Sequence, residues 1–310
     1  MNKDALGDFI SEIVNQLPHA SGEVRRLFHG RGRWWPGLEQ LTADWIDNQL
    51  VVAIFKEQDD SFLHRLKQAL NELAGSVSWG KASGKAIIIQ YRYQSSSQTE
   101  VITGDVEWAP IVTENGLKYQ MSLGKNQNSG LFLDMRLGRD WVQKQSHHCR
   151  VLNLFSYTCG FSVAAIEGGA SVVVNVDMSK PALSVGRENH RLNGHDLSKV
   201  KFLPHDIFKS WGKIRKNGPY DLIIIDPPSF QKGSFALTSD YKKILKRLSE
   251  LLSRDGTVLA CVNSPSLTSQ FLIEQMAEYA PDVKFVARLD NPAEFSDIDP
   301  EAALKVMVFR

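Results

Sequence analysis

The segment best suited to chemistry in this sequence follows the apolar run 222–225 and reads Asp226-Pro227-Pro228-Ser229-Phe230. Its two prolines remove two backbone donors and stiffen the turn, so the Asp226 carboxylate and the proline carbonyls are left as acceptors. Phe230 adds a flat apolar face. The combination suits a planar base that bears an amino group and is held after leaving its stack. A plain proline-rich turn is the alternative.

Two more acids follow apolar runs, in Val176-Asp177-Met178-Ser179 and in His205-Asp206-Ile207. An acid at the end of a strand is placed to accept hydrogen bonds from two ribose hydroxyls, which is the role we expect for Asp177. Asp206 would accept from an adenine amino group while Ile207 packs on the ring. An aspartate after a strand is also an ordinary helix N-cap, and for Asp206 the two interpretations balance. For Asp177 the cap is the weaker interpretation, because Ser179 provides a better one.

Apolar runs that alternate with helical patterns would position these residues from Arg150 onward. Strands with little polar alternation, separated by helices, indicate an α/β fold with a parallel sheet covered on both faces. Ligands of such sheets bind beyond the carboxyl ends of the strands. The dinucleotide fingerprint G-x-G-x-x-G is absent, which weakens a nicotinamide dehydrogenase interpretation. We expect strands at 151–154, 171–176, 200–203, 222–225, 258–262, 283–289 and 304–309, and helices near 160–167, 180–192, 239–252 and 268–279.

The first part of the chain is mixed, and we predict an N-terminal α+β domain over residues 1–135 and a second domain over 136–310. Helical spacing of apolar residues covers 4–17 and 61–73, and short strands are expected at 50–55 and 86–93. Residues 110–123 predict a hairpin, because Asn115-Gly116 supplies the positive φ that its turn needs.

Residues 25–37 are rich in arginine, aromatic and turn residues and are expected to form a loop. Cations for phosphate and rings for unpaired bases are what recognition of single-stranded RNA uses. The alternative is a loop whose tryptophans pack on the body of the domain and whose arginines pair locally.

Composition sets outer limits on function. The 310 residues carry a net charge of +1, 43% are hydrophobic and 23% are charged, as in ordinary globular proteins. No segment is apolar and long enough to span a membrane, and the N-terminus does not have the pattern of a signal peptide, so we expect a cytoplasmic protein. The three cysteines lack metal-ligand spacing, and neither a metal nor a membrane is expected as a partner.

These segments, in this order, resemble the class I S-adenosylmethionine-dependent methyltransferases, and most closely the bacterial 23S ribosomal RNA methyltransferases of the cytosine-C5 and guanine-N7 types. The resemblance covers roughly residues 85–290 and implies a Rossmann-like seven-stranded domain preceded by a smaller mixed α+β domain. Upstream, residues 129–136 look like that family's G-x-[FY]-L-D-x-R element. Cys159 departs from the family, which usually has a second glycine there. The other resembling segments are 153–161, 176–179, 206–208 and 226–230.

The resemblance also implies which residues bind S-adenosyl-L-methionine. Phe155, Tyr157 and Gly160 would line its methionine end, Asp177 would hold its ribose, and Asp206 and Ile207 its adenine. Asp134 and Arg136 would close the pocket, although a surface ion pair is the plain alternative for Arg136. The other expected cofactor contacts are Phe132, Asn153, Ser156, Thr158, Met178, Ser179 and Asp226.

The implied catalytic residues are Asp226, Pro227, Pro228, Phe230 and Asn263, and the position of Asn263 bears on the atom that is methylated. The cytosine-C5 enzymes have a cysteine there, because carbon 5 becomes nucleophilic only after a thiolate adds to carbon 6. A nitrogen needs only positioning and, for an amine, removal of a proton. We therefore expect methylation of a nitrogen of an RNA base, most simply ribosomal RNA, with Cys261 as core rather than a displaced nucleophile.

Three other functions stay open at this point. They are a catalytically silent RNA-binding or ribosome-assembly factor, a cytosine-C5 RNA methyltransferase, and a methyltransferase of proteins or small molecules. The fold alone does not separate them, because function depends on the site. The oligomeric state is not predicted.

Overall fold

The computed structural model describes residues 5–20, 22–94, 98–124, 128–228 and 237–310. Two compact units divide the chain. Unit 1 contains the chain up to Leu133 together with Pro292–Ile298, and unit 2 contains Asp134–Asn291 and Asp299–Arg310.

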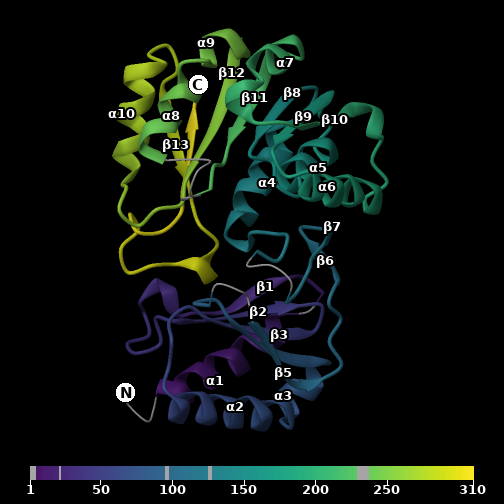
Figure 1. Ribbon diagram of the computed structural model, residues 1–310, viewed down its shortest axis with the longest axis vertical. Coiled ribbons are helices and arrows are strands. Elements are labelled where there is room, and N and C mark those ends of the chain that lie inside the picture. Colours follow the sequence, from purple (N-terminus) through teal and green to yellow (C-terminus); the bar gives the residue numbers. More distant parts are fainter. Residues whose placement is uncertain (1–4, 21, 95–97, 125–127, 229–236) are drawn as a thin grey trace. The chain divides into compact units, whose positions relative to one another are not determined.

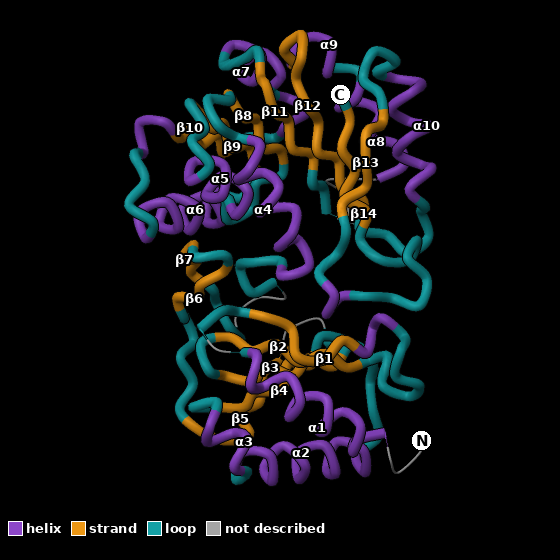
Figure 2. The backbone as a smooth tube through the Cα atoms, turned by 180° about the vertical axis from the view of Figure 1, so that it is seen from behind, coloured by secondary structure: helices purple, strands orange, loops and turns teal. Residues whose placement is uncertain are grey.

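Unit 1 is built on a five-stranded sheet with the order β1-β2-β3-β4-β5, and α1 and α2 cover one face of it (Figures 1 and 2). The core between them contains Phe9 and Ile13 of α1 and Leu66 and Leu70 of α2. Asp59 caps α2 by accepting a hydrogen bond from the Phe62 N–H. The elements are α1 Ala5–Gln16, β1 Arg25–His29, β2 Leu41–Ile46, β3 Gln49–Ile54, α2 Asp60–Ala74, α3 Val77–Lys81, β4 Ala86–Tyr91, β5 Gln98–Gly104, β6 Ile111–Glu114 and β7 Leu117–Gln120, with 3-10 turns η1 Leu17–His19, η2 Gly30–Gly32 and η6 Ala293–Phe295.

The sequence-based prediction of a loop over residues 25–37 is wrong for its first part, which forms β1. Arg25 and Arg26 lie opposite Trp45 and Asp44 of β2, and the ladder hydrogen bonds override the high polarity of the segment. The predicted hairpin is confirmed as β6 and β7, whose turn residues Asn115 and Gly116 have φ of 50° and 76°.

Unit 2 has a seven-stranded sheet with the order β10-β9-β8-β11-β12-β14-β13, which confirms the predicted fold class. The neighbours from β10 to β12 are parallel, and β14 is antiparallel to both β12 and β13. Helices α4 and α5 cover one face of the sheet and α8, α9 and α10 the other. The elements are α4 Arg136–Gln145, β8 Arg150–Leu154, α5 Gly160–Glu167, β9 Val172–Asp177, α6 Lys180–Leu192, β10 Val200–Pro204, α7 Trp211–Lys216, β11 Tyr220–Ile225, α8 Leu237–Leu245, α9 Leu248–Leu251, β12 Leu252–Val262, α10 Ser269–Tyr279, β13 Phe285–Leu289 and β14 Lys305–Phe309, with 3-10 turns η3 Leu133–Met135, η4 Leu197–Lys199 and η5 Ile207–Lys209.

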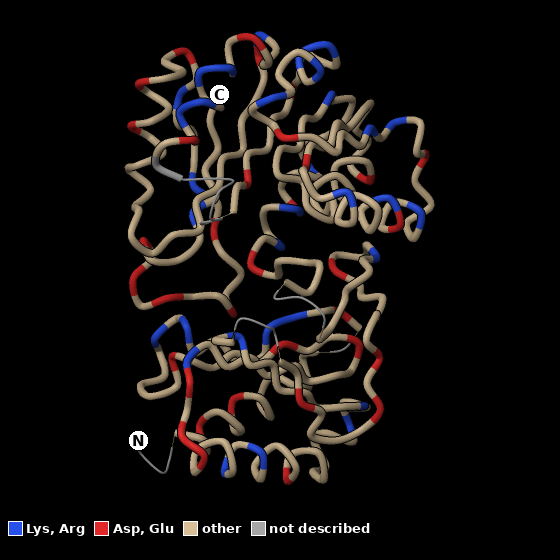
Figure 3. The backbone as a smooth tube through the Cα atoms, in the orientation of Figure 1, with Lys and Arg blue, Asp and Glu red and all other residues tan. Residues whose placement is uncertain are grey.

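Basic and acidic residues are interspersed along both units (Figure 3), as the near-neutral net charge suggests. No helix in the described part of the chain is long and apolar enough to cross a membrane.

Candidate functional site at the carboxyl edge of the parallel strands

Five parallel strands of unit 2 end at one edge of the sheet. The chain starts with β8 in the middle, adds β9 and β10 on one side, and then places β11 on the other side of β8. The order therefore reverses between β8 and β11, which is where open α/β sheets bind ligands. Leu154, Val176 and Ile225 lie in register across β8, β9 and β11, so the segments that follow these strands start side by side.

The loop after β8 has an unusual backbone. Phe155, Tyr157 and Cys159 have φ of 56°, 45° and 64°, in the left-handed region that residues other than glycine rarely adopt. Each such residue costs about 1–3 kcal/mol, so the surrounding structure must hold the loop in place. Gly160 begins α5 directly after the loop. The N–H groups of Ser156 and Cys159 donate to the carbonyl oxygens of Val176 and Ser156, which ties the loop to β9 and to itself.

Helix α6 holds this loop. The side-chain amide of Asn189, which is buried, donates a hydrogen bond of 2.9 Å to the Thr158 carbonyl. Gly186 faces the buried Cys159, and a Cβ on Gly186 would lie 2.4 Å from the Cys159 sulfur. The glycine usual at 159 is thus replaced by a side chain for which Gly186 leaves room. Sequence reasoning missed both α6 residues, because they lie about one helix and one strand away along the chain.

Asp177 ties the loop to β9. Its Oδ2 accepts a hydrogen bond from the Tyr157 N–H (2.8 Å), and its Oδ1 accepts from the Ser179 N–H (2.7 Å). A carboxylate has about four acceptor positions, so room for two ribose hydroxyls remains. Ser179 caps α6 by accepting from the Ala182 N–H (3.2 Å), as expected from the sequence. Met178 is 55% exposed beside Asp177 and offers an apolar surface.

Asp206 follows β10 and caps the short turn η5. Its Oδ1 accepts from the Phe208 N–H at 2.9 Å, and its Oδ2 lies 3.7 Å from the Lys209 ammonium. Ile207 is buried in the core on the α8–α10 face of the sheet. The structure confirms the cap interpretation of Asp206, and the adenine contacts of Asp206 and Ile207 stay predictions.

Asp226 follows β11 in an environment that resists charge. Desolvation, and after it repulsion from Asp134, raise the pKa of Asp226 to about 7, although Arg139 acts in the opposite direction. Arg139 is a buried residue of α4 that the sequence analysis did not single out. Pro227 is buried and Pro228 partly so. Phe230 lies outside the described residues, as does Ser229.

The end of β12 brings Cys261 and Asn263 to the same edge. Cys261 is 1% exposed and packs in the core on the α4–α5 face, and burial together with Asp226 and Asp134 raises the pKa of its thiol well above the ordinary value. Such a thiol carries almost no thiolate, so it is a poor nucleophile. Asn263 is exposed just after the strand.

Two buried residues that the sequence analysis missed hold this end of β12. The Tyr241 hydroxyl, on α8, lies 3.2 Å from the Cys261 carbonyl oxygen and 3.4 Å from that of Ile225. The Lys305 ammonium donates to the carbonyl oxygens of Ser264 and Glu301, each at 2.7 Å. A buried ammonium needs such partners, and here they fix the loop that carries Asn263.

Asn153 lies beneath the loop after β8 and belongs to a buried polar chain. Its amide donates to Asn175 Oδ1, whose own amide donates to Ser162 Oγ, each at 2.9 Å. Ser162 Oγ lies 2.9 Å from His190, whose pKa burial lowers to about 3. Within the described chain Asn153 Oδ1 is buried without a hydrogen-bond partner.

Three predicted cofactor contacts lie before β8. Asp134 and Arg136 belong to unit 2, where Arg136 begins α4. Phe132 belongs to unit 1 and is exposed. The roles of all three in closing a pocket stay predictions.

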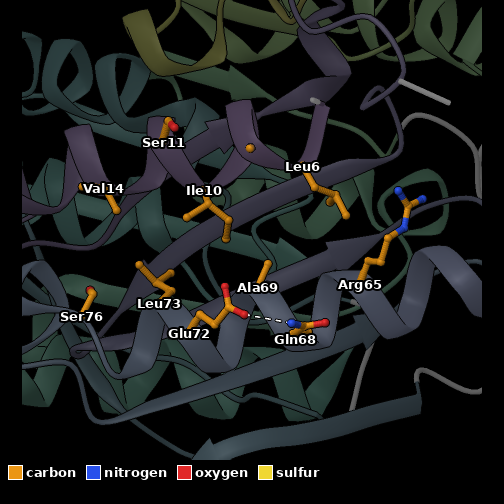
Figure 4. A pocket seen from close by; sticks show the side chains of 11 residues that line it. Leu6, Ile10, Ser11, Val14, Arg65, Gln68, Ala69, Glu72, Leu73 and Ser76 are labelled. Atoms are coloured by element: carbon orange, nitrogen blue, oxygen red, sulfur yellow. Dashed lines mark hydrogen bonds between the residues drawn. The ribbon is translucent and has the colours of Figure 1, made fainter. Parts of the chain in front are cut away.

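A groove in unit 1 contains none of the predicted site residues. It lies between α1 and α2 and is lined by Leu6 and Ile10 of α1 and by Leu73 and Arg65 of α2 (Figure 4). In the part of the chain that is described, no group of three or more His, Cys, Asp and Glu side chains is placed to hold a metal ion.

Comparison with known proteins identifies a family and a curated relative. The family model described as S-adenosylmethionine-dependent methyltransferase matches residues 25–310. A relative from Aeromonas salmonicida, named Ribosomal RNA large subunit methyltransferase I, is 35% identical over 245 residues, which cover 77% of this chain and 61% of the relative. The chain thus spans about three fifths of the length of this curated relative.

Two solved structures share the fold. One is described as a methyltransferase complexed with SAH, and the other as a SAM-dependent methyltransferase from Streptococcus mutans. Each has a TM-score of 0.85 and 24% sequence identity, and the similarity covers 98% of this chain and 80% and 81% of the two others.

Proposed function

The chain belongs to the family of S-adenosylmethionine-dependent methyltransferases, and from this premise we propose that it methylates a base nitrogen of ribosomal RNA. The observation that carries the proposal is the common sheet edge at which Asp177 ends β9 and Asp226 follows β11. Asp177 is held in place to bind hydroxyls, and Asp226 has a pKa near neutral pH. The name of the relative from Aeromonas salmonicida supports ribosomal RNA as the substrate.

The residues present fit the cofactor. Asp177 retains acceptor positions for two ribose hydroxyls, Asn153 Oδ1 is a buried acceptor without a partner within the described chain, and Met178 supplies an apolar face. When bound, S-adenosylmethionine supplies a methyl group on a sulfonium, which is already an activated donor. The work left to the protein is therefore orientation and exclusion of water.

We propose that Asp226, the two proline carbonyls and Asn263 bind the target base. The Asp226 carboxylate would accept a hydrogen bond from an exocyclic amine and take its proton as the methyl group is transferred, because a base with a pKa near 7 is suited to proton transfer at neutral pH. The exposed Asn263 would orient the base from β12. The buried, protonated thiol of Cys261 supports nitrogen rather than carbon 5 as the acceptor.

We further propose that unit 1, the domain predicted over residues 1–135, binds RNA, and that the protein acts in the cytoplasm. The second statement rests on the substrate: ribosomal RNA is the partner that the relatives' name indicates.

The test is transfer from tritiated S-adenosylmethionine to unmodified large-subunit ribosomal RNA transcribed in vitro, followed by mass spectrometry of the nucleosides. An N-methylated base that the Asp226→Asn variant fails to form supports the proposal. Methylation of cytosine C5 would refute the nitrogen assignment. Binding of cofactor and RNA without any transfer would make the protein a silent RNA-binding factor.

A further inference from the structure

Three strands of unit 1 end at one edge of its sheet. Both β1 and β3 are antiparallel to β2, and β4 is parallel to β3, so β1, β3 and β4 run in the same direction. The residues that follow them therefore gather at their common carboxyl edge. These residues are Arg31 in η2, Phe55 after β3 and Arg92 after β4.

Two guanidinium groups share the ring of Phe55. The Arg31 guanidinium carbon lies 4.4 Å from the ring centroid, and that of Arg92 lies 5.4 Å from it. Stacking on an aromatic face fixes a planar guanidinium while its N–H edges stay available for hydrogen bonds.

The positive charge of this pair is only partly balanced by carboxylates nearby. Within the described chain, neither Arg31 nor Arg92 has a carboxylate within ion-pair distance, whereas nearby Arg26 is held by both oxygens of Asp44, at 2.7 and 2.9 Å. Desolvation, and after it repulsion from Arg26, lower the pKa of Arg31. Desolvation, and after it repulsion from Arg31, lower the pKa of Arg92, although attraction to Asp44 acts in the opposite direction. An anion bound between the two groups would relieve this repulsion.

We propose that Arg31 and Arg92, stacked on Phe55, bind a phosphodiester group of the RNA backbone. Planar guanidinium forks match phosphate oxygens, and two forks fixed on one ring lose little side-chain freedom on binding. Trp34, three residues after Arg31, is 57% exposed and offers a face on which an unpaired base can stack, which favours RNA over an acidic peptide. Arg33 is not part of the pair, because it is bound to Asp297. The inference rests on the proposed RNA substrate and locates its binding on unit 1.

The test measures binding of a fluorescein-labelled single-stranded 20-nucleotide RNA by fluorescence anisotropy in a series of potassium chloride concentrations. The Arg31→Gln/Arg92→Gln variant is expected to raise the Kd about tenfold, as for the loss of a charge-assisted hydrogen-bond pair. The slope of log Kd against log salt should fall by roughly 0.7 for one lost phosphate contact. Arg65→Gln on α2 removes one positive charge away from the pair and should leave both values nearly unchanged.

Calorimetric titration with S-adenosylmethionine separates this inference from the proposed function. If intact protein binds RNA and the double variant binds it as tightly as Arg65→Gln does, the phosphate site is refuted and the proposed function stands. If the intact protein binds cofactor but no RNA, the phosphate site and the proposed RNA substrate are both refuted. Should the glutamine variant fail to fold, Arg31→Lys/Arg92→Lys decides, because it keeps the charge and loses the planar fork: a several-fold rise in Kd is expected, and an unchanged Kd refutes the site.

Discussion

Asp226 is the residue at which burial and charge act most directly on the proposed chemistry. Desolvation and the neighbouring Asp134 raise its pKa from 3.8 to about 7. Only the ionised form accepts a proton, so its fraction rises about tenfold between pH 6 and pH 8. We expect the single-turnover rate of methyl transfer to rise by the same factor over this range. The rate of Glu274→Gln, a control on α10, should follow the wild-type profile, and a flat wild-type profile would contradict the role of Asp226.

The same raised pKa has a consequence for stability. Because the folded-state pKa lies above the ordinary value, ionisation of Asp226 costs stability as the pH rises from about 4 to about 7. Asp226→Asn removes this cost. Its melting temperature should therefore exceed that of the wild type at pH 8 and approach it at pH 4, as measured by calorimetry. A variant that is less stable than the wild type at pH 8 would show that the carboxylate is better solvated than its surroundings indicate.

The Cys261 thiol distinguishes methylation of a nitrogen from the cytosine-C5 mechanism, which needs a thiolate nucleophile. As a buried core residue it contributes packing, so Cys261→Ala should cost about 1 kcal/mol of unfolding free energy and leave the transfer rate within about twofold. Cys149→Ala, a change at a less buried cysteine, is the matched control. A folded but inactive Cys261→Ala protein would restore the cytosine-C5 mechanism.

At the scale of elements, helix α6 determines the shape of the loop after β8. Gly186→Ala places a methyl group 2.4 Å from the Cys159 sulfur, so it must displace the loop that is proposed to line the cofactor site. We expect the Kd for S-adenosylmethionine to rise at least about tenfold, a loss of 1.4 kcal/mol or more. The measurement is calorimetric titration.

A second substitution tests this contact directly. Cys159→Gly removes the clashing side chain at a position whose φ of 64° suits glycine, so Gly186→Ala/Cys159→Gly should recover most of the lost affinity. The double-mutant cycle would then show strong coupling between the two sites. Additive effects would mean that α6 does not act on the loop through this contact.

At the scale of the whole molecule, unit 1 includes a segment that lies far along the chain. Residues 292–298 return to it, with Phe295 buried, packed against the His29 ring and covered by the Arg26 guanidinium. Phe295→Ala should lower the unfolding free energy by about 3 kcal/mol and increase hydrogen exchange in β1, more than 260 residues earlier in the sequence.

The control for this prediction is Phe285→Ala on the edge strand β13, where the ring is 44% exposed. It should cost less than about 1 kcal/mol and leave exchange in β1 unchanged. Equal exchange of β1 in the two variants would mean that the returning segment does not stabilise unit 1.

The sequence by itself determined the features that depend on neighbours along the chain. Apolar runs without alternation identified the strands of unit 2, the Asn115-Gly116 pair identified a hairpin, and Ser179 identified the start of α6. The order of acids after the strands was enough to place them at one edge, because parallel strands with helical crossovers end on the same side.

Only the tertiary structure decided what depends on distance through space. Residues 25–29 are a strand because β2 pairs with them, against their own polarity. The pKa of Asp226 depends on Asp134, 92 positions earlier, and the loop after β8 packs against Gly186 of α6. Desolvation, charge repulsion and steric contact act across a few ångströms, and the chain brings such pairs together only when it folds.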